Sequence, residues 1–378
     1  MNNGPIKRLG EVCVKIGSGA TPRGGRDSYK VSGIPLIRSQ NVLDFAFSED
    51  GLAFIDGKQA KQLDNVIVQP NDVLINITGD SIARVCKAPV EYLPARVNQH
   101  VSIIRADPEK ADPNYLLYYL QYQKPRLLSL GSSGGTRNAL TKQMLEDLQI
   151  PLPHLSTQHA IGCALASLDA KIASNKRINH HLEQMAQAIY KEWFIDNDEV
   201  GKWEKRKLGD VCEFSYGKGL KEDDRQPGPI GVYGSNGLIG WHGELLAKGP
   251  GIVVGRKGNP GTVTWVAMDF YPIDTAFYVT KKKNDTSLYW LFYTLKSLDL
   301  PNLSADSAVP GLNRNIAYLS YVLYPPEELM HEFDELVKPT FETIHANIVE
   351  SRTLTALRDT LLPRLMSGEL SMADVDAK

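Results

Sequence analysis

The sequence predicts an α/β (α+β) protein built from two tandem α/β domains with curved mixed sheets, each followed by a long helix. Three observations support this prediction. An internal repeat spans the chain, short β-rich runs separated by turn residues fill each globular half, and two helical stretches carry apolar residues in alternating steps of four and three. The expected segments are a first domain at 1–153, a central helix at 154–199, a second domain at 200–325 and a C-terminal helix at 326–378.

Length and composition agree with this organisation. A chain of 378 residues has room for two or three domains. With 42% apolar residues and no run of about 18 of them, it matches neither a membrane-spanning nor a disordered protein. The N-terminus lacks the apolar core of a signal peptide, and the cysteines lack the spacing of a zinc site or a disulfide framework. We expect a cytoplasmic protein with four reduced thiols: Cys13, Cys86, Cys163 and Cys212.

Charge is distributed unevenly, although the net charge of the whole chain is only −2. Residues 1–150 carry 18 basic and 15 acidic side chains (+3), and residues 201–300 carry 14 and 11 (+3). Residues 151–200 carry 4 and 6 (−2), and residues 301–378 carry 6 and 12 (−6). Two mildly basic blocks therefore alternate with two acidic blocks, although imbalances of this size also occur on ordinary solvated surfaces.

The repeat begins at the start of each domain. Residues 7–13 (KRLGEVC) return as residues 207–212 (KLGDVC), and each copy is followed by a pair of glycines. An aromatic stretch at 113–120 matches one at 287–293, and GTRN at 135–138 has a counterpart in GLNRN at 311–315. The long helices correspond at an offset of 172 residues, so each repeat unit is a globular block followed by a helix.

Each globular block contains short runs rich in β-branched and apolar residues, bounded by Gly, Pro, Asn and Asp. The runs lie at 34–38, 72–77 and 97–104 in the first block, and at 251–255, 262–266 and 276–280 in the second. An aromatic-rich helix closes each block, at 113–123 and at 286–297. This pattern predicts a strongly curved sheet with a few helices.

Both helical stretches show the spacing of a coiled-coil seam, which extends from Ile161 to Trp193 and from Phe333 to Leu365. Arg358 interrupts the second seam, and Pro339 is expected to kink or restart its helix. About 40 residues at 1.5 Å each form a rod of roughly 60 Å.

Asparagines occupy the seam near the middle of each helix, at Asn175 and Asn347. If the helices form an antiparallel coiled coil with pseudo-twofold symmetry, these two residues come close together, where a buried polar pair fixes the helix–helix register. The alternative is two independently packed amphipathic helices that tolerate the asparagines.

The sequence lacks the usual signatures of an enzyme. The glycine-rich stretch 131–136 has no lysine before its threonine and is not a phosphate-binding loop. There is no HExxH, no GxSxG, no Asn-Pro-Pro-aromatic motif of amino-methyltransferases, and no histidine pattern with metal-ligand spacing. These absences favour a non-catalytic chain. Two alternatives stay open: a DNA-modifying or nuclease enzyme with an unrecognised site, and an interaction protein whose globular blocks bind protein.

Polar and basic residues gather in turns between the predicted strands of both blocks. Arg, Asn and Gln bond bidentately to guanine and adenine edges, whereas Lys, Ser and free backbone amides suit phosphates. Loops on a stiff sheet are where recognition residues usually lie. Each turn alone is ordinary, but their concentration in two related blocks indicates nucleic-acid binding. The turns lie at 21–26, 38–41, 76–84, 98–100 and 132–138, and at 216–221, 233–237, 256–261 and 313–315.

Over essentially the whole chain, these residues resemble the specificity (S, HsdS) subunits of type I restriction-modification systems. Residues 9–22 and IPLIRSQN at 34–41 look like the opening of many of their target-recognition domains. The most specific match is YGSNGLIG at 233–240 with VGRKG at 254–258. The proline junctions at 151–153 and 324–326 and the ending LLPRLMSGEL at 361–370 also match. Pro339 and the acidic second helix depart from the pattern.

The resemblance implies a non-catalytic subunit of a methyltransferase and restriction endonuclease complex that serves anti-phage defence. Each target-recognition domain would bind one half of a bipartite double-stranded DNA target, and the paired helices would space the two domains. Two methyltransferase subunits carrying S-adenosylmethionine would dock on the chain to modify adenines. A restriction subunit using ATP and Mg²⁺ would join for cleavage, so this chain would hold no cofactor of its own.

The residues expected to contact DNA are polar side chains of the turns named above. In the first domain they are Arg23, Arg38, Gln40, Asn41, Asn76, Arg84, Asn98 and Arg137. In the second domain they are Lys218, Tyr233, Ser235, Asn236, Arg256, Lys257 and Arg314. No residue is expected to be catalytic or to bind a metal.

Overall fold

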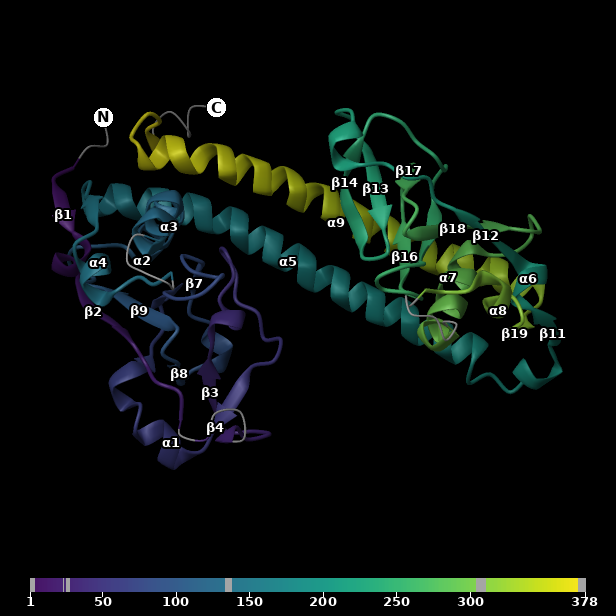
Figure 1. The fold of residues 1–378 in the computed structure, drawn as a ribbon, viewed down its shortest axis with the longest axis horizontal. Coiled ribbons are helices and arrows are strands. Elements are labelled where there is room, and N and C mark those ends of the chain that lie inside the picture. The colour runs from purple at the N-terminus through teal and green to yellow at the C-terminus, as the bar shows by residue number, and fades with distance from the viewer. Residues whose placement is uncertain (1–3, 23, 25–27, 133–137, 304–310, 373–378) are drawn as a thin grey trace. The chain divides into compact units, whose positions relative to one another are not determined.

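The computed structural model of the chain describes residues 4–22, 24, 28–132, 138–303 and 311–372. The chain forms two compact units, one made of residues 1–173 with 351–378 and the other of residues 174–350. Each unit contains one globular domain and part of each long helix (Figure 1). None of the helices in the described part combines the length and the apolarity needed to cross a membrane.

Two four-stranded sheets and a two-stranded ribbon form the domain of the first unit. The sheet orders are β2-β9-β6-β7 and β4-β3-β8-β5, and the ribbon pairs β1 with β10. The strands are β1 (Ile6–Arg8), β2 (Cys13–Ser18), β3 (Ile34–Ile37), β4 (Ala53–Ile55), β5 (Ile67–Val68), β6 (Val73–Asn76), β7 (Val85–Lys87), β8 (Ala95–Val97), β9 (Val101–Ala106) and β10 (Gln149–Pro151). The helices are α1 (Gly57–Lys61), α2 (Pro113–Tyr122), α3 (Lys124–Ser132) and α4 (Lys142–Glu146).

The domain of the second unit repeats this topology with one strand fewer, since nothing in the described part of its second sheet corresponds to β5. Its sheets have the orders β12-β18-β15-β16 and β14-β13-β17, and its ribbon pairs β11 with β19. The strands are β11 (Glu204–Lys207), β12 (Cys212–Tyr216), β13 (Ile230–Gly234), β14 (Gly237–His242), β15 (Gly251–Gly255), β16 (Val263–Val266), β17 (Phe270–Pro272), β18 (Ala276–Lys281) and β19 (Tyr321–Tyr324). The helices are α6 (Leu208–Val211), α7 (Leu288–Ser297) and α8 (Arg314–Ala317).

The two domains therefore correspond strand by strand apart from β5, which has no counterpart among the described residues of the second domain, as the internal repeat predicts. In both, one parallel pair, β3 with β8 or β13 with β17, lies in an otherwise antiparallel sheet. The mixed α/β fold class is confirmed.

The aromatic helices α2 and α7 form the centre of each domain core. Each begins at a side-chain cap, Asp112 for α2 and Ser287 for α7, which accepts a hydrogen bond from a backbone amide of the first turn. Most of the residues within α2 and α7 are buried. In α2, the hydroxyls of Tyr115 and Tyr119 donate to the carbonyls of Pro151 and Gln149, at 2.8 and 2.7 Å, and so attach the helix to β10.

Buried phenols and thiols make the fold sensitive to alkali. Burial raises the pKa of Tyr119 and of Tyr289 from 10.0 to about 12, and it raises the pKa of the Cys13 and Cys212 thiols from 9.0 to about 12. The folded state thus favours the neutral forms. Their contribution to the free energy of unfolding is complete below pH 9, and it is lost as pH rises through 9–12.

We therefore expect the free energy of unfolding to fall steadily above about pH 9. Urea unfolding followed by circular dichroism at pH 8, 10 and 11, with reductant present, measures this decline. Tyr119→Phe removes one of the titrating groups and should make the decline between pH 10 and 12 shallower. A free energy of unfolding that stays constant from pH 8 to 11 would contradict the expectation.

The long helices are α5 (Leu155–Phe194) and α9 (Glu327–Met366). In the second unit they run antiparallel, because Asn179 contacts Ile344 whereas Asn175 contacts Glu350. Asn175 is fully buried, and its Nδ2 donates to Oε2 of Glu350 at 2.7 Å and to the carbonyl of Asn347 at 3.4 Å. The antiparallel packing predicted from the sequence is confirmed.

The asparagine pairing differs in detail from the predicted one. The side chain of Asn347 donates to Oδ1 of Asn179 at 2.8 Å rather than to the side chain of Asn175. Asn347 therefore links two asparagines of α5: its carbonyl accepts from Asn175, and its side chain donates to Asn179. Moving the register would take the partners from the buried Asn175 and from the half-buried Asn179 and Asn347, and this fixes the alignment of the helices.

Pro339 does not interrupt the second helix, contrary to the expected restart. The helix α9 runs unbroken through it, and both Pro339 and Glu335, whose carbonyl loses its amide partner, are exposed. A freed carbonyl on an exposed face can bond to water, so the helix tolerates proline there.

Arg358, which interrupts the apolar seam, is part of a buried network in the first unit. It is 8% exposed, its Nη1 lies 2.6 Å from Oδ1 of Asp169, and its guanidinium lies 3.7 Å from the ring centre of Phe45. The hydroxyl of Tyr118 donates to the other carboxylate oxygen of Asp169 at 2.6 Å. These four residues attach the domain to its helices. The domain contributes Phe45, from the connection between β3 and β4, and Tyr118, from α2.

In the second unit, an aromatic cluster attaches the domain to its helices. Phe333 of α9 meets Phe194 of α5 edge to face, with ring centres 5.0 Å apart. Tyr293 of α7 stacks on Tyr190 of α5 at 5.3 Å. At the 172-residue offset, Phe341 and Ala186 take the places of Asp169 and Arg358. Phe341 packs against the domain through Trp265, at 4.7 Å.

Candidate nucleic-acid interface

The polar turns of the first domain meet at one edge of its sheets. β2 and β6 both run antiparallel to β9, so their last residues, Ser18 and Asn76, lie beside its start. β3 runs parallel to β8, so Ile37 and Val97 end at the same edge. The turns 19–22, 38–41, 77–84 and 98–100 follow these strand ends. We call the surface that these four turns form edge 1.

The second domain has an equivalent edge. β12 and β15 both run antiparallel to β18, so Tyr216 and Gly255 lie beside its start. β13 runs parallel to β17, and Tyr233 pairs with Pro272 there. The turns 217–221, 235–236, 256–261 and 273–275 follow, and the amide of Leu312 donates to the carbonyl of Arg256 at 2.9 Å, which adds residues 313–315. We call this surface edge 2.

Three of the residues predicted to contact DNA are buried within edge 1. Asn41, Asn76 and Asn98 are 0%, 0% and 4% exposed. Asn41 Nδ2 donates to the carbonyl of Ser48 at 2.9 Å, and Asn76 Nδ2 donates to that of Ser39 at 2.8 Å. Their amides hold the turns in shape. The structure therefore corrects the expectation for these three: they support the edge and are not on its surface.

Other predicted residues of the first domain are also tied to neighbouring loops. Arg38 Nη2 donates to the carbonyl of Gly51, and its guanidinium lies 5.2 Å from the ring centre of Tyr29. Gln40 is exposed, but its Nε2 donates to the carbonyl of Asp50 at 3.1 Å. Arg84 is half-buried in the turn that links β6 to β7. Arg23 and Arg137 lie outside the described residues.

Two predicted arginines of the second domain converge on one exposed ring. The guanidinium carbons of Arg256 and Arg314 lie 4.7 and 4.5 Å from the ring centre of Tyr216, which is 48% exposed. Each arginine is held by one Nη1 bond to a backbone carbonyl, to Asp274 at 3.2 Å and to Phe214 at 3.0 Å. The remaining N–H groups of each fork can bond to phosphate or to guanine.

The other predicted residues of the second domain surround this cluster. Lys218, Asn236 and Lys257 are exposed. Ser235 is half-buried, and its carbonyl lies close to Gly255, where a Cβ would come within 3.2 Å of it. Tyr233 packs edge to face on Phe270 at 6.1 Å, and burial raises the pKa of its phenol. Tyr233 therefore supports the core more than the surface.

Two features of the edges were within predicted turns but were not chosen. Tyr216 begins the turn that contains the predicted Lys218, and only the fold shows that two arginines lie against its ring. Gln99 and His100 directly follow Asn98, the residue of this turn that the sequence predicts to contact DNA. Alternation along the turn is the signal that could have found them, because Asn98 points inward and Gln99 is exposed.

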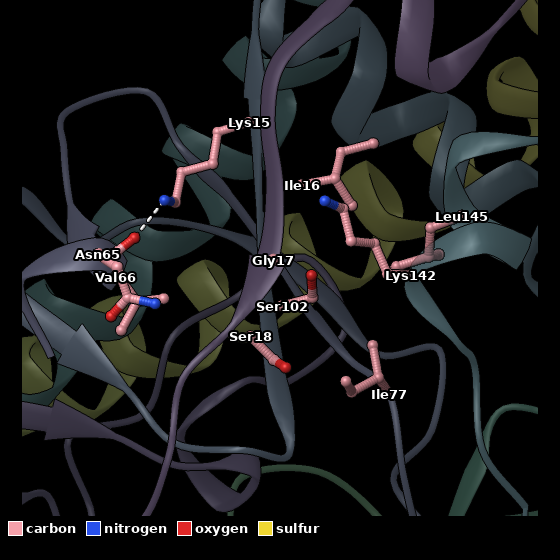
Figure 2. A pocket seen from close by; sticks show the side chains of 10 residues that line it. All are labelled: Lys15, Ile16, Gly17, Ser18, Asn65, Val66, Ile77, Ser102, Lys142 and Leu145. Atoms are coloured by element: carbon pink, nitrogen blue, oxygen red, sulfur yellow. Dashed lines mark hydrogen bonds between the residues drawn. The ribbon is translucent and has the colours of Figure 1, made fainter.

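A pocket of about 370 Å³ lies in the first domain between β2 and α4, and it borders edge 1 at Ile77 (Figure 2). Two lysines line it, but both have partners: Lys15 donates to the carbonyl of Asn65, and Lys142 lies 3.4 Å from Glu146. None of the predicted DNA-contact residues is among its lining residues. Within the described part of the chain, no group of three or more His, Cys, Asp or Glu side chains is arranged to hold a metal ion.

Comparison with known proteins gives concordant results. Residues 4–184 and 201–316 match the family model described as type I restriction modification DNA specificity domain. The type I restriction enzyme MjaIX specificity subunit of Methanocaldococcus jannaschii is 24% identical over 424 aligned positions, covering 98% of this chain and 93% of that one. The HindI specificity subunit of Haemophilus influenzae is also 24% identical, over 63% of this chain and 72% of its own.

A solved structure shares the fold. The S subunit of a type I restriction-modification system from M. genitalium superposes with a TM-score of 0.65 at 18% identity, covering 96% of both chains. The family model covers most of the sequence, including both globular domains. The chain therefore belongs to the family of type I restriction-modification DNA specificity subunits, as its repeat and its motifs predicted, and it is a specificity subunit rather than an enzyme.

Proposed function

We propose that this chain reads a bipartite double-stranded DNA sequence, with one half-site at edge 1 and the other at edge 2. In this proposal the chain is also the scaffold for two adenine-methyltransferase subunits and a restriction subunit in the cytoplasm. S-adenosylmethionine, ATP and Mg²⁺ would be bound by those partners. One observation carries the proposal: two domains whose strand orders match apart from β5 gather polar turns at equivalent edges. A protein built from such a repeat has two similar faces with which to bind one duplex.

The two edges have the chemistry that the proposal needs. Edge 2 presents Arg256 and Arg314 on Tyr216, flanked by the exposed Lys218 and Lys257. Charged and planar groups of this kind position a protein on phosphates and read guanine edges. The relatives named above are specificity subunits of restriction enzymes, which supports a partnership with other subunits of such a system.

The test combines purification with a map of DNA methylation. We expect a tagged chain from its own cells to co-purify a methyltransferase, and deletion of its gene to remove one split, adenine-methylated motif from the genome. The purified chain alone, supplied with S-adenosylmethionine or Mg²⁺, should neither methylate nor cleave DNA. An unchanged methylome after deletion, or catalysis by the chain alone, would refute the proposal.

A further inference from the structure

The turn between β8 and β9 presents a single glutamine at edge 1. The amide of Asn98 donates to the carbonyl of Ile37 at 3.0 Å, and its side-chain Oδ1 accepts from the amide of His100 at 3.0 Å. Asn98 is buried, whereas Gln99 is exposed. The buried asparagine thus shapes the turn, and the next residue is its outermost point.

The side chains of Thr21, from another turn, and His100, from the same turn, fix the orientation of the Gln99 amide. The hydroxyl of Thr21 donates to its Oε1, and its Nε2 lies 3.0 Å from Nε2 of His100. Nδ1 of His100 lies 2.6 Å from the hydroxyl of Thr78. When the neutral imidazole carries its proton on Nδ1 and donates to Thr78, its Nε2 accepts from Gln99. Each of the three contacts that link Thr21, Gln99, His100 and Thr78 then pairs a donor with an acceptor.

Thr21 reaches Gln99 because the backbone after β2 approaches the turn closely. The amide of Gly19 donates to the carbonyl of Asn98 at 3.1 Å. A Cβ at Gly19 would lie 1.8 Å from the carbonyl oxygen of Val97, so only glycine fits there. The loop that carries Thr21 is therefore held against the turn that carries Gln99.

The fixed amide keeps one N–H of Nε2 and one lone pair of Oε1 free. Adenine offers the matching pair in the major groove, with N7 as acceptor and N6 as donor. We infer that Gln99 is a specificity-determining residue of the first domain, that it recognises an adenine in the half-site read by edge 1, and that Thr21 and His100 are its positioning residues. The inference rests on the proposed function.

The repeat supports the importance of this position. In the second domain the turn between β17 and β18 occupies the same place. The backbone amide of Ile273 donates to the carbonyl of Tyr233 there, and the amide of Asn98 donates to the carbonyl of Ile37 in the same way in the first domain. Asp274 corresponds to Gln99 and is also exposed. A carboxylate only accepts hydrogen bonds and suits the N4 amino group of cytosine. The equivalent points of the two edges therefore carry side chains with different base preferences.

The test uses the assembled complex and reads its methylated motif and its binding to duplexes that differ at single base pairs. Gln99→Ala should relax one position of one half-site, reducing discrimination there about 10- to 100-fold. Gln99→Glu, which can only accept, should shift that position from adenine towards cytosine. Thr21→Val should weaken discrimination at the same position without changing the preferred base. Gln62→Glu makes the same chemical change at an exposed residue that follows α1, outside edge 1, and should leave the motif intact.

The outcomes separate the inference from the function on which it rests. If the wild-type complex methylates a bipartite motif and Gln99→Ala leaves every position of it unchanged, Gln99 does not read a base. The same holds if the relaxed position contains no adenine on either strand. If the wild-type complex shows no bipartite motif, the proposed function itself fails. Gln99→Ala removes an exposed side chain, and an unchanged melting temperature will show that the domain stays folded.

Discussion

Arg358→Leu is expected to lower the free energy of unfolding of the first unit by about 3–5 kcal/mol. The substitution removes the cation from a network that is nearly closed to solvent and leaves the carboxylate of Asp169, 17% exposed, with Tyr118 as its remaining partner in that network. An unpaired buried carboxylate is costly because it has lost its water. The stacking of the guanidinium on Phe45 is lost as well.

Urea unfolding monitored by circular dichroism measures this loss. Arg364→Leu is the matched control, since Arg364 lies on the same helix and in the same unit but is 44% exposed in its pair with Glu369, and its loss should change stability by less than 1 kcal/mol. The double variant Asp169→Leu with Arg358→Leu should be more stable than Arg358→Leu alone, because the only carboxylate then left unpaired in this network is Asp359, which is 56% exposed. If Arg358→Leu lowers the free energy of unfolding no more than Arg364→Leu does, the network does not hold the domain on its helices.

Replacing both arginines of edge 2, Arg256→Ala with Arg314→Ala, is expected to weaken binding of the assembled complex to its duplex by at least about 100-fold. If both side chains contact phosphates, the slope of log affinity against log salt should also decrease by about 2. Fluorescence anisotropy between 50 and 200 mM salt measures both quantities. The half-site read by edge 1 should keep its sequence preference.

The matched control removes two positive charges from the other end of the same domain. Lys281 and Lys283 are exposed at and beyond the end of β18, whose start lies at edge 2. Lys281→Ala with Lys283→Ala changes the net charge by the same amount, so it reports the general effect of charge alone. Equal losses from the two double variants would show that edge 2 has no special part in binding.

Much of the fold could be predicted from the sequence because patterns among neighbouring residues indicate where its domains and helices lie. The repeated KRLGEVC and KLGDVC stretches located both domains, and the steps of four and three between apolar residues located α5 and α9. The continuity of α9 at Pro339 could not be predicted, since it depends on which face of the helix is exposed. The partner of Asn347 depends on the relative rotation of two helices, which a pattern along one chain does not specify.

The candidate site was predictable at the level of turns but not of side chains. The turns gather at two edges because the order and direction of the strands place them there. Whether an asparagine in such a turn faces outward is decided by tertiary contacts, as Asn76 shows by reaching the carbonyl of Ser39 on another strand connection. Tyr216 lay in a predicted turn, but its two arginines come from positions 40 and 98 residues further along the chain.

The unlike attachments of the two domains make their positions in the chain non-interchangeable. A copy of the first domain transplanted onto the helices of the second would meet Phe341 and Ala186 where it needs Asp169 and Arg358, and the hydroxyl of Tyr118 would be buried against a ring that accepts no ordinary hydrogen bond. Recombination between the two halves of such a gene would therefore yield folded products only when each domain is exchanged together with its own stretch of helix. Under the proposed function, the order of the two half-sites would thus depend on packing between domain and helix, outside edges 1 and 2.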